Sequence, residues 1–346
     1  MATAVKRYIL VKTYVVAFAI ALFTSWILTP YVKNLAFKIG AVDKPDPRKV
    51  HKGIMPRLGG LAIFVGFLIA VLTTVTMSRD LFGILTGAFV ILIVGILDDV
   101  YQLPAKVKLL GQIAAAAVLI LFGIQIEWLN NPFGGYFYLD YLSIPITIFW
   151  VVSFTNVVNL MDGLDGLAAG VSAIASVTII LVALQQGYYT VAVMTAALAG
   201  GIIGFIRYNF NPATIFMGDT GSMFIGYILA AISILGAVKS ATTIALIVPA
   251  IALGLPIMDT AFAILRRHLA GKPIFKPDKG HFHHRLLAMG LTQRQAVILM
   301  YLISAGLGLS AILLTEIDGI YAVLLVSAIV AGVCFCAKKI GILNDR

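Results

Sequence analysis

Carboxylate and amide side chains gather at the ends of apolar segments, and these are the residues best suited to chemistry. Asp98 and Asp99 end one apolar run, and the segment NVVNLMDGLDGLA ends a later one. Four of its polar residues recur every three positions: Asn156, Asn159, Asp162 and Asp165. Polar groups at the edge of a membrane span are costly and point to function. Oxygen ligands of this kind suit a hard cation such as Mg²⁺.

The three-residue spacing of this polar series predicts neighbouring side chains on a helix, because residues three apart lie on adjacent turns. Gly163 and Gly166 remove side-chain bulk beside the carboxylates, which lets a ligand approach the backbone. A short loop with Asp-Gly turns is the alternative. Such a loop accounts for one Asp-Gly pair but not for the whole series, so the pattern favours a functional site.

The segment FMGDTGS predicts the start of a helix at Asp219, followed by an apolar run. A plain helix cap explains this segment equally well in isolation. A helix N-terminus also attracts phosphate. Together with the polar series, this segment therefore favours a functional site.

The adjacent carboxylates of Asp98 and Asp99 form a like-charged pair, in which one pKa is expected to rise and suit a proton acceptor. A solvated loop start is the alternative. Lys106 and Lys108 follow, and they either bind phosphate or extend towards the membrane surface.

The segment HFHHR contains three histidines within four positions, which suggests zinc at first sight. Three such side chains on a loop do not easily face one ion, and no Cys completes a site. A cradle for an anion fits better. Its members are His281, His283, His284 and Arg285, with Lys276 and Lys279 nearby. Arg57, in the PRLGG loop, either extends to the membrane surface or contacts a phosphate.

The composition places these residues in a membrane protein. Hydrophobic residues make up 61% of the 346 and charged residues 12%, about half the share in soluble domains. The mean hydropathy is +1.02. These values exclude a soluble fold and a disordered chain, and long continuous apolar runs exclude an outer-membrane barrel. The fold class is therefore an all-α polytopic membrane protein, as one domain over residues 1–346.

The apolar runs predict eleven transmembrane helices. They cover about 10–32, 58–77, 80–97, 109–126, 143–160, 166–185, 188–206, 220–238, 241–263, 295–314 and 319–337. Pro249, Gly254 and Pro256 predict a kink in the ninth. An aromatic segment with Gly134-Gly135, within 127–141, predicts a small extracytoplasmic β-hairpin. Gly200 and Gly204 indicate close helix packing.

Lys and Arg are distributed unequally over the two faces of this predicted topology. The face with the C-terminus has 20 of them and the face with the N-terminus has 5. The positive-inside rule therefore places the C-terminus in the cytoplasm and the N-terminus outside. Every polar cluster described above falls on the cytoplasmic face, which predicts one site that handles a metal, phosphates and a lipid substrate.

Seven segments in order resemble the polyprenyl-phosphate N-acetylhexosamine-1-phosphate transferases of the glycosyltransferase 4 family, in the branch that uses UDP-N-acetylglucosamine. The resemblance covers nearly the whole chain. The segments are DKPDPRKVH, PRLGG, Asp98-Asp99, Lys108, NVVNLMDGLDGLA, NFNPATIFMGDTGS and PDKGHFHHRLL.

The resemblance implies transfer of N-acetylglucosamine-1-phosphate from UDP-N-acetylglucosamine to undecaprenyl phosphate with release of UMP. It implies Mg²⁺, with Mn²⁺ as the alternative, a homodimer, and the bacterial cytoplasmic membrane. The product would enter a cell-envelope glycan such as teichoic acid or O-antigen.

The resemblance also assigns roles to single residues. Asp219 and Asn159 match the metal-site pair, which Asp162 borders. Asp165 and Phe216 match positions that hold the uracil. Positions around the phosphates and sugar are matched by Lys108, His281, His283, His284 and Arg285. Asp98 and Asp99 match the pair that activates the lipid phosphate. Asn156 and Arg57 are further expected substrate contacts.

Several alternatives stay open at this point. Relatives that transfer phospho-N-acetylmuramoyl-pentapeptide have three consecutive His before Phe-Glu, whereas Phe282 interrupts the series here. The interruption favours the simpler sugar nucleotide. A secondary transporter would place its polar site near the membrane midplane, often between repeats, and a channel would need a polar ring along a pore. A CDP-alcohol transferase needs a longer Asp-Gly pattern, which is absent. Direct attack by the lipid phosphate is favoured over an enzyme-bound intermediate.

Overall fold

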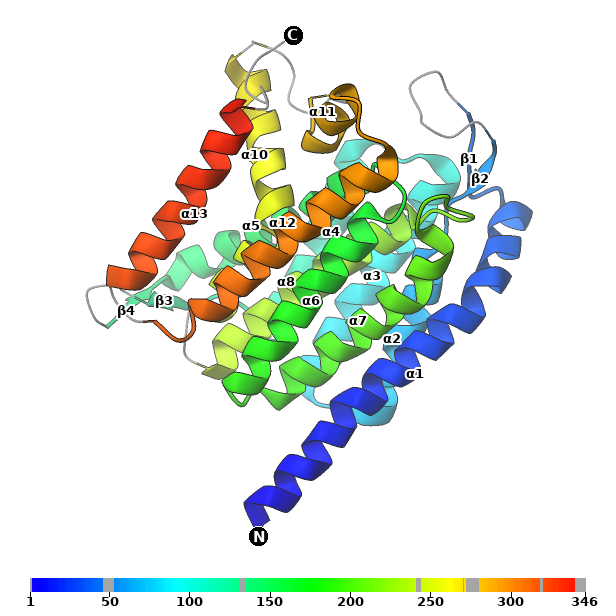
Figure 1. Cartoon of the computed structure of the whole chain (residues 1–346). Helices are drawn as coiled ribbons and strands as arrows, with labels where there is room; N and C mark the ends of the chain where they lie inside the picture. The colour runs from blue at the N-terminus through cyan, green and yellow to red at the C-terminus, as the bar shows by residue number, and fades with distance from the viewer. Residues whose placement is uncertain are drawn as a thin grey trace.

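The computed structural model is mostly helical (Figure 1). It describes residues 2–45, 53–130, 135–240, 244–269, 271, 280–317 and 320–339. The first half contains α1 (Ala2–Ile39), β1 (Val42–Asp43), β2 (Met55–Pro56), α2 (Gly60–Thr74), α3 (Arg79–Tyr101), α4 (Ala105–Leu121), β3 (Trp128–Asn130), β4 (Tyr136–Tyr138) and η1 (Asp140–Leu142). The second half contains α5 (Ser143–Met161), α6 (Leu167–Gln185), α7 (Tyr189–Asn209), α8 (Gly218–Ser240), α9 (Ile244–Ala252), α10 (Gly254–Leu269), α11 (Phe282–Ala288), α12 (Gln293–Leu313) and α13 (Ile320–Lys339).

Each predicted apolar segment coincides with a helix, and the ninth coincides with the pair α9 and α10. Within the described part of the chain, seven helices are long and apolar enough to cross a membrane, and the bent pair raises this to eight. The apolar stretches of α2 and α13 are shorter. The chain is thus a multi-pass membrane protein, while eleven spans and their orientation stay predictions.

The predicted kink in the ninth segment is confirmed as a full break. Pro249 lies inside α9, and α10 begins at Gly254 with its axis bent by 75° from α9. Proline removes a helical hydrogen bond and its ring crowds the preceding turn, so helices bend where it occurs. The break turns α10 towards the end of the bundle that carries α11 (Figure 1).

The central helix α8 is buried along nearly its whole described length, and glycines let its neighbours approach. Gly60 of α2 lies against Gly221 of α8, and Gly95 of α3 lies against Thr220. A methyl group on either of these two glycines would collide with the backbone of α8. These contacts fix the beginning of α8, where Asp219 lies.

The predicted close packing at Gly200 and Gly204 is confirmed, because both glycines of α7 lie directly against backbone carbonyls of α1. These carbonyls belong to Phe18 and Leu22. Figure 1 shows α1 running along this side of the molecule, with its N-terminal end extending beyond the bundle.

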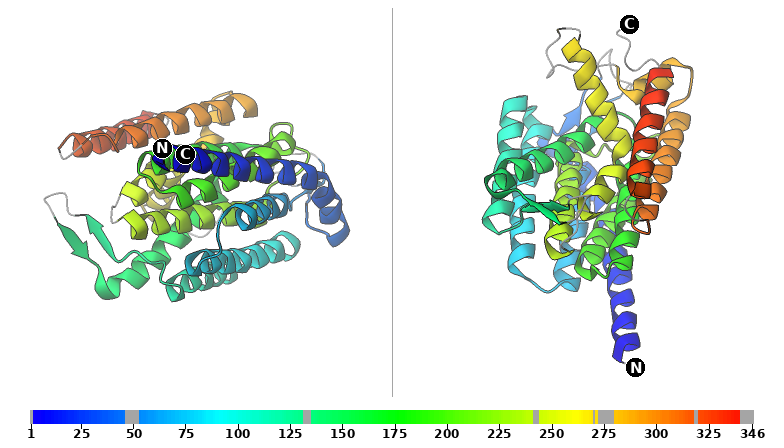
Figure 2. Two further views of the ribbon diagram at one scale, coloured as in Figure 1. Left: turned by 90° about the horizontal axis from the view of Figure 1, so that it is seen from below. Right: turned by 90° about the vertical axis from the view of Figure 1, so that its left-hand side faces the viewer.

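The two ends of the bundle differ in structure. Strands β1 and β2 pair antiparallel and lie with α11 at the end opposite the N-terminus (Figure 1). Strands β3 and β4 also pair antiparallel, with Trp128 opposite Tyr138, and project from the edge of the bundle (Figure 2). The residues 131–134 between them lie outside the described residues. Which side of the membrane this strand pair faces stays a prediction.

Candidate active site

The residues before α8 are held by the segment around the PRLGG loop. Phe216 N donates to Pro56 O at 2.8 Å, and Gly59 N donates to Phe216 O at 3.0 Å. Gly60 N donates in the same way to Met217 O at 2.8 Å. This backbone pairing brings Arg57 alongside the first turn of α8, although more than 150 residues separate them in sequence.

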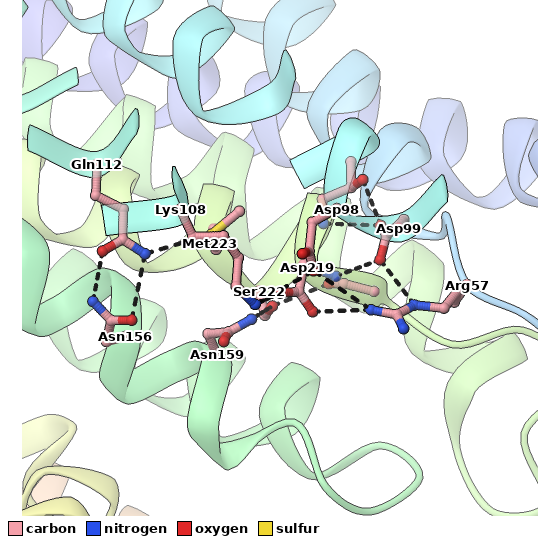
Figure 3. Close-up of polar contacts among 12 residues, drawn as sticks. Arg57, Asp98, Asp99, Lys108, Gln112, Asn156, Asn159, Asp219, Ser222 and Met223 are labelled. Atoms are coloured by element: carbon pink, nitrogen blue, oxygen red, sulfur yellow. Dashed lines mark hydrogen bonds and ion pairs between the residues drawn. The ribbon is translucent and has the colours of Figure 1, made fainter. Parts of the chain in front are cut away.

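Five predicted residues from four parts of the chain form one charged cluster (Figure 3). Arg57 Nη2 lies 3.2 Å from Asp219 Oδ1, and its Nε lies 3.0 Å from Asp99 Oδ1. Lys108 Nζ lies 2.8 Å from Asp219 Oδ2 and 3.4 Å from Asp98 Oδ2. Burial alone would lower the pKa of Arg57, but the carboxylates of Asp99 and Asp219 outweigh it and raise that pKa.

Asp99 has a structural role that the sequence did not reveal. Its oxygens accept hydrogen bonds from Asp219 N at 2.9 Å, Thr220 N at 3.0 Å and Thr220 Oγ1 at 2.6 Å. Asp99 therefore caps α8 from a neighbouring helix, and its side chain is fully buried. The predicted helix start is confirmed. Asp99 engages the second and third N–H groups of α8, and attraction of phosphate to this helix N-terminus stays a prediction.

The acidic cluster has the chemistry of a metal site. Carboxylate oxygens of Asp98, Asp99 and Asp219 lie within 4.8 Å of one another. Asp99 already accepts four hydrogen bonds, counting that from Arg57. Asp219 instead faces a cavity that Asn159 also lines. A carboxylate and an amide beside open space fit a hard cation that keeps part of its shell for water and substrate.

This cavity has a volume of about 530 Å³, within the usual range for small-molecule sites. Seven predicted site residues line it: Arg57, Asn159, Asp162, Asp165, Phe216, Asp219 and His284. Asp43, Asn211 and Gln293 also line it and were not among the predicted site residues. The cavity therefore joins segments from the beginning, middle and end of the chain.

The polar series at 156–165 does not form one helical stripe. Helix α5 ends at Met161, so Asp162 lies at its C-terminus and Asp165 lies in the following turn. Asp165 Oδ2 accepts hydrogen bonds from Asn211 Nδ2 at 3.1 Å and Ala213 N at 3.0 Å. Burial raises the pKa of Asp162 to about 7, and the negative charges of Asp219 and Asp99 act in the same direction.

Asn156 lies apart from the cavity residues. Its Nδ2 donates to Gln112 Oε1 at 2.6 Å (Figure 3). The same Nδ2 donates to Val152 O at 2.8 Å. Gln112 is buried and was missed in the sequence, although an amide in the apolar run after Lys108 is a detectable signal. A substrate contact by Asn156 stays a prediction.

Gly163 lines the cavity and also contacts the ring of His283. The expectation that a ligand approaches its backbone stays a prediction. A Cβ at Gly163 would lie 2.7 Å from His283 Nε2. The glycine therefore lets α11 pack onto the turn after α5. This contact brings the histidine segment to the wall of the cavity.

The histidine segment forms the short helix α11 rather than a loop. The rings of His281 and His283 are parallel with centroids 5.8 Å apart, and those of His283 and His284 are 4.2 Å apart. Only His284 of the three lines the cavity. Burial lowers the pKa of His283 to about 3, so this imidazole is neutral at pH 7. Arg285 lies on the same helix and does not line the cavity, while Lys276 and Lys279 lie outside the described residues.

Comparison with known proteins places this chain in a family. Residues 81–237 match the family model described as glycosyl transferase family 4. The chain is 44% identical over 334 residues to the probable undecaprenyl-phosphate N-acetylglucosaminyl 1-phosphate transferase of Bacillus subtilis (strain 168), covering 96% of this chain and 93% of that protein.

More distant relatives carry similar names. One is the decaprenyl-phosphate N-acetylglucosaminephosphotransferase of Mycobacterium tuberculosis (strain ATCC 25618 / H37Rv), 38% identical over 80% of this chain and 76% of that protein. Another is the undecaprenyl-phosphate alpha-N-acetylglucosaminyl 1-phosphate transferase of Escherichia coli (strain K12), 30% identical over 83% of this chain and 80% of that protein. The resemblance drawn from the sequence motifs is thereby confirmed, and the chain belongs to glycosyl transferase family 4.

Proposed function

We propose that the protein transfers N-acetylglucosamine-1-phosphate from UDP-N-acetylglucosamine to undecaprenyl phosphate. An oxygen of the lipid phosphate attacks the phosphorus that bears the sugar. The bond from that phosphorus to the bridging oxygen breaks, and UMP leaves with this oxygen. The product is undecaprenyl-diphospho-N-acetylglucosamine, the starting unit of a cell-envelope glycan such as teichoic acid or O-antigen.

The observation that carries the proposal is the position of Asp219, which lies between two cations at the wall of a nucleotide-sized cavity. Arg57 and Lys108 each contact a different oxygen of this carboxylate. The same two cations suit the phosphates of both substrates, because phosphoryl transfer depends mainly on positioning and charge neutralisation.

The cavity walls suggest how the sugar nucleotide is oriented. Phe216 and Asp165 both line the cavity, and an aromatic ring and a carboxylate suit stacking and hydrogen bonding of the uracil. Asp219 and Asn159 would hold a divalent cation, Mg²⁺ or Mn²⁺. When bound there, this cation supplies charge neutralisation for the diphosphate.

Purified protein tests this proposal directly. With undecaprenyl phosphate, UDP-N-acetylglucosamine and Mg²⁺ we expect UMP release and formation of the diphospholipid, each lost when lipid or metal is omitted. UDP-N-acetylmuramoyl-pentapeptide and other UDP-N-acetylhexosamines are assayed as substrates in parallel. Turnover with the pentapeptide substrate alone would keep the chemistry and reject the sugar assignment. No turnover with any of them by folded protein would reject the transferase and favour the transporter.

We further propose that the chain acts as one domain in the bacterial cytoplasmic membrane, with the site on the cytoplasmic face. The excess of Lys and Arg on that predicted face supports this orientation. Labelling of single introduced cysteines in intact cells and in inverted vesicles tests it. The homodimer rests on the family resemblance alone, and the molecular mass of the purified protein–detergent complex tests it.

A further inference from the structure

Asp259 of α10 holds two different groups at the start of α11. Its Oδ2 lies 3.0 Å from Nδ1 of His281. Its Oδ1 accepts a hydrogen bond from Phe282 N at 2.8 Å. One carboxylate therefore fixes both an imidazole ring and the first backbone N–H of the helix that carries His283 and His284.

The environment of this carboxylate makes both contacts strong. The side chains of Asp259 and His281 are each 11% exposed. Asp259 and Phe282 line an apolar cavity of about 260 Å³ between α10, α12 and α13, together with Met258 and Phe262. Hydrogen bonds in such low-polarity surroundings are electrostatically stronger than in water.

Asp259 also supplies a cap that α11 lacks in its own sequence. His281 occupies the N-cap position of α11, and its side chain makes no capping hydrogen bond. The carboxylate of Asp259 takes this place from another helix, as Asp99 does for α8. A second contact from α10 supports the same segment, because Arg266 Nη1 donates to Gly280 O at 3.2 Å.

A carboxylate beside Nδ1 determines where the imidazole carries its hydrogen. Because an ionised carboxylate only accepts hydrogen bonds, Nδ1 of His281 must donate, and in the neutral ring the lone pair then lies on Nε2. The ring of His281 stacks parallel to that of His283, which contacts His284 at the cavity wall. The direction of all three imidazoles therefore depends on the start of α11.

We propose that Asp259 is a positioning residue, which fixes the Nδ1–H form of His281 and the direction of the histidines on α11. The inference rests on the proposed function, since it assigns a role within the same site. Asp259 does not line the 530 Å³ cavity, so its effect passes through the histidines.

The substitution Asp259→Asn separates orientation from packing. The Asn oxygen still accepts from Phe282 N, so the helix cap is kept. The Asn amide now donates towards Nδ1 of His281, which forces the hydrogen to Nε2. We expect kcat to fall by roughly 100-fold, as for the misplacement of side chains that position the substrate, with KM for the sugar nucleotide changed by less than about threefold. Asp259→Glu keeps a carboxylate and should recover part of kcat.

Nuclear magnetic resonance of ¹⁵N-histidine-labelled protein gives a readout independent of turnover. The chain has five histidines, and His281→Gln assigns the signal of interest. We expect that signal to report hydrogen on Nδ1 in the wild type and on Nε2 in Asp259→Asn. Arg266→Gln, which loosens the same segment, should lower the melting temperature without moving the hydrogen. The control Asp80→Asn, in the first turn of α3, should change neither kcat nor the spectrum.

Three results would overturn the proposal. One is an unchanged kcat in Asp259→Asn despite a moved hydrogen. Another is parallel loss of kcat and melting temperature in Asp259→Asn and Arg266→Gln, which indicates a packing role only. The third is a wild-type spectrum in which His281 carries no hydrogen on Nδ1. This result needs only the wild-type protein, so the proposal can be tested even if Asp259→Asn does not fold. Absence of wild-type turnover would instead reject the proposed function, while the spectra still test the hydrogen position.

Discussion

The carboxylate of Asp99 accepts a hydrogen bond from the backbone N–H of Asp219 at 2.9 Å, so one acidic residue holds another at the start of α8. Asp219 is thereby fixed through its own backbone, and its side chain is left to contact Arg57, Lys108 and the cavity. Two residues that look alike in sequence therefore have separate roles, and substitutions should distinguish them.

Asp219→Asn should abolish UMP release and leave the fold intact. The substitution removes the charge that a divalent cation and both basic side chains require, while its size and backbone contacts stay the same. The measurement is turnover together with the melting temperature in detergent. Asp80→Asn, the same substitution in the first turn of α3, is the matched control. Substantial turnover in a folded Asp219→Asn variant would reject its role in metal binding.

Asp99→Ala should destabilise the protein more than Asp219→Asn does. It removes a helix cap, which usually contributes about 0.5–2 kcal/mol, and it leaves Arg57 without one of its buried partners. Melting temperature with and without sugar nucleotide is the readout. Equal stability of the two variants would show that the cap contributes little.

The stability of the protein without metal should fall as the pH rises from about 4 to about 7. The pKa of Asp162 is raised from its ordinary 3.8 to about 7 by burial, so the folded state keeps a proton that the unfolded state has released. In Asp162→Asn the melting temperature should depend less on pH, by roughly a few degrees over this range. The experiment is thermal unfolding in chelator at several pH values. An unchanged slope in the variant would exclude Asp162 as its source.

Gly163→Ala should reduce turnover with a smaller effect on the fold. The added methyl group would lie 2.7 Å from His283 Nε2 and would push α11 away from the cavity. Gly306→Ala in α12, where a methyl group meets nothing within 4 Å, is the control and should be neutral. Wild-type kcat in Gly163→Ala would mean that α11 adjusts without consequence for the site.

The sequence identified the helical segments well, because apolar length is a property of consecutive residues. The break near Gly254 was also predictable, since Pro249 and Pro256 act on their own helix. The number of spans was less certain, because α2 has 15 residues and does not reach the length that a span needs by itself.

Interactions between distant segments were less accessible to sequence reasoning. The spacing of Asn159 and Asp162 predicted neighbouring side chains on one helix, yet α5 ends at Met161 and Asp162 follows it. Gly163 was interpreted as room for a ligand, but its contact with His283, which lies 120 residues further along the chain, was not predicted. Asp99 was interpreted as a chemical group because its capping partners follow it by about 120 residues.

The glycine contacts around α8 have a consequence for protein engineering. Replacing helical glycines by alanine is a common route to thermostable variants, since it gains roughly 0.5–1 kcal/mol each through helix propensity. At Gly60, Gly95 and Gly221 this gain is unattainable, because the extra carbon coincides with a neighbouring backbone. A library that seeks a more robust enzyme should therefore leave these three positions fixed and direct its changes to open sites such as Gly332.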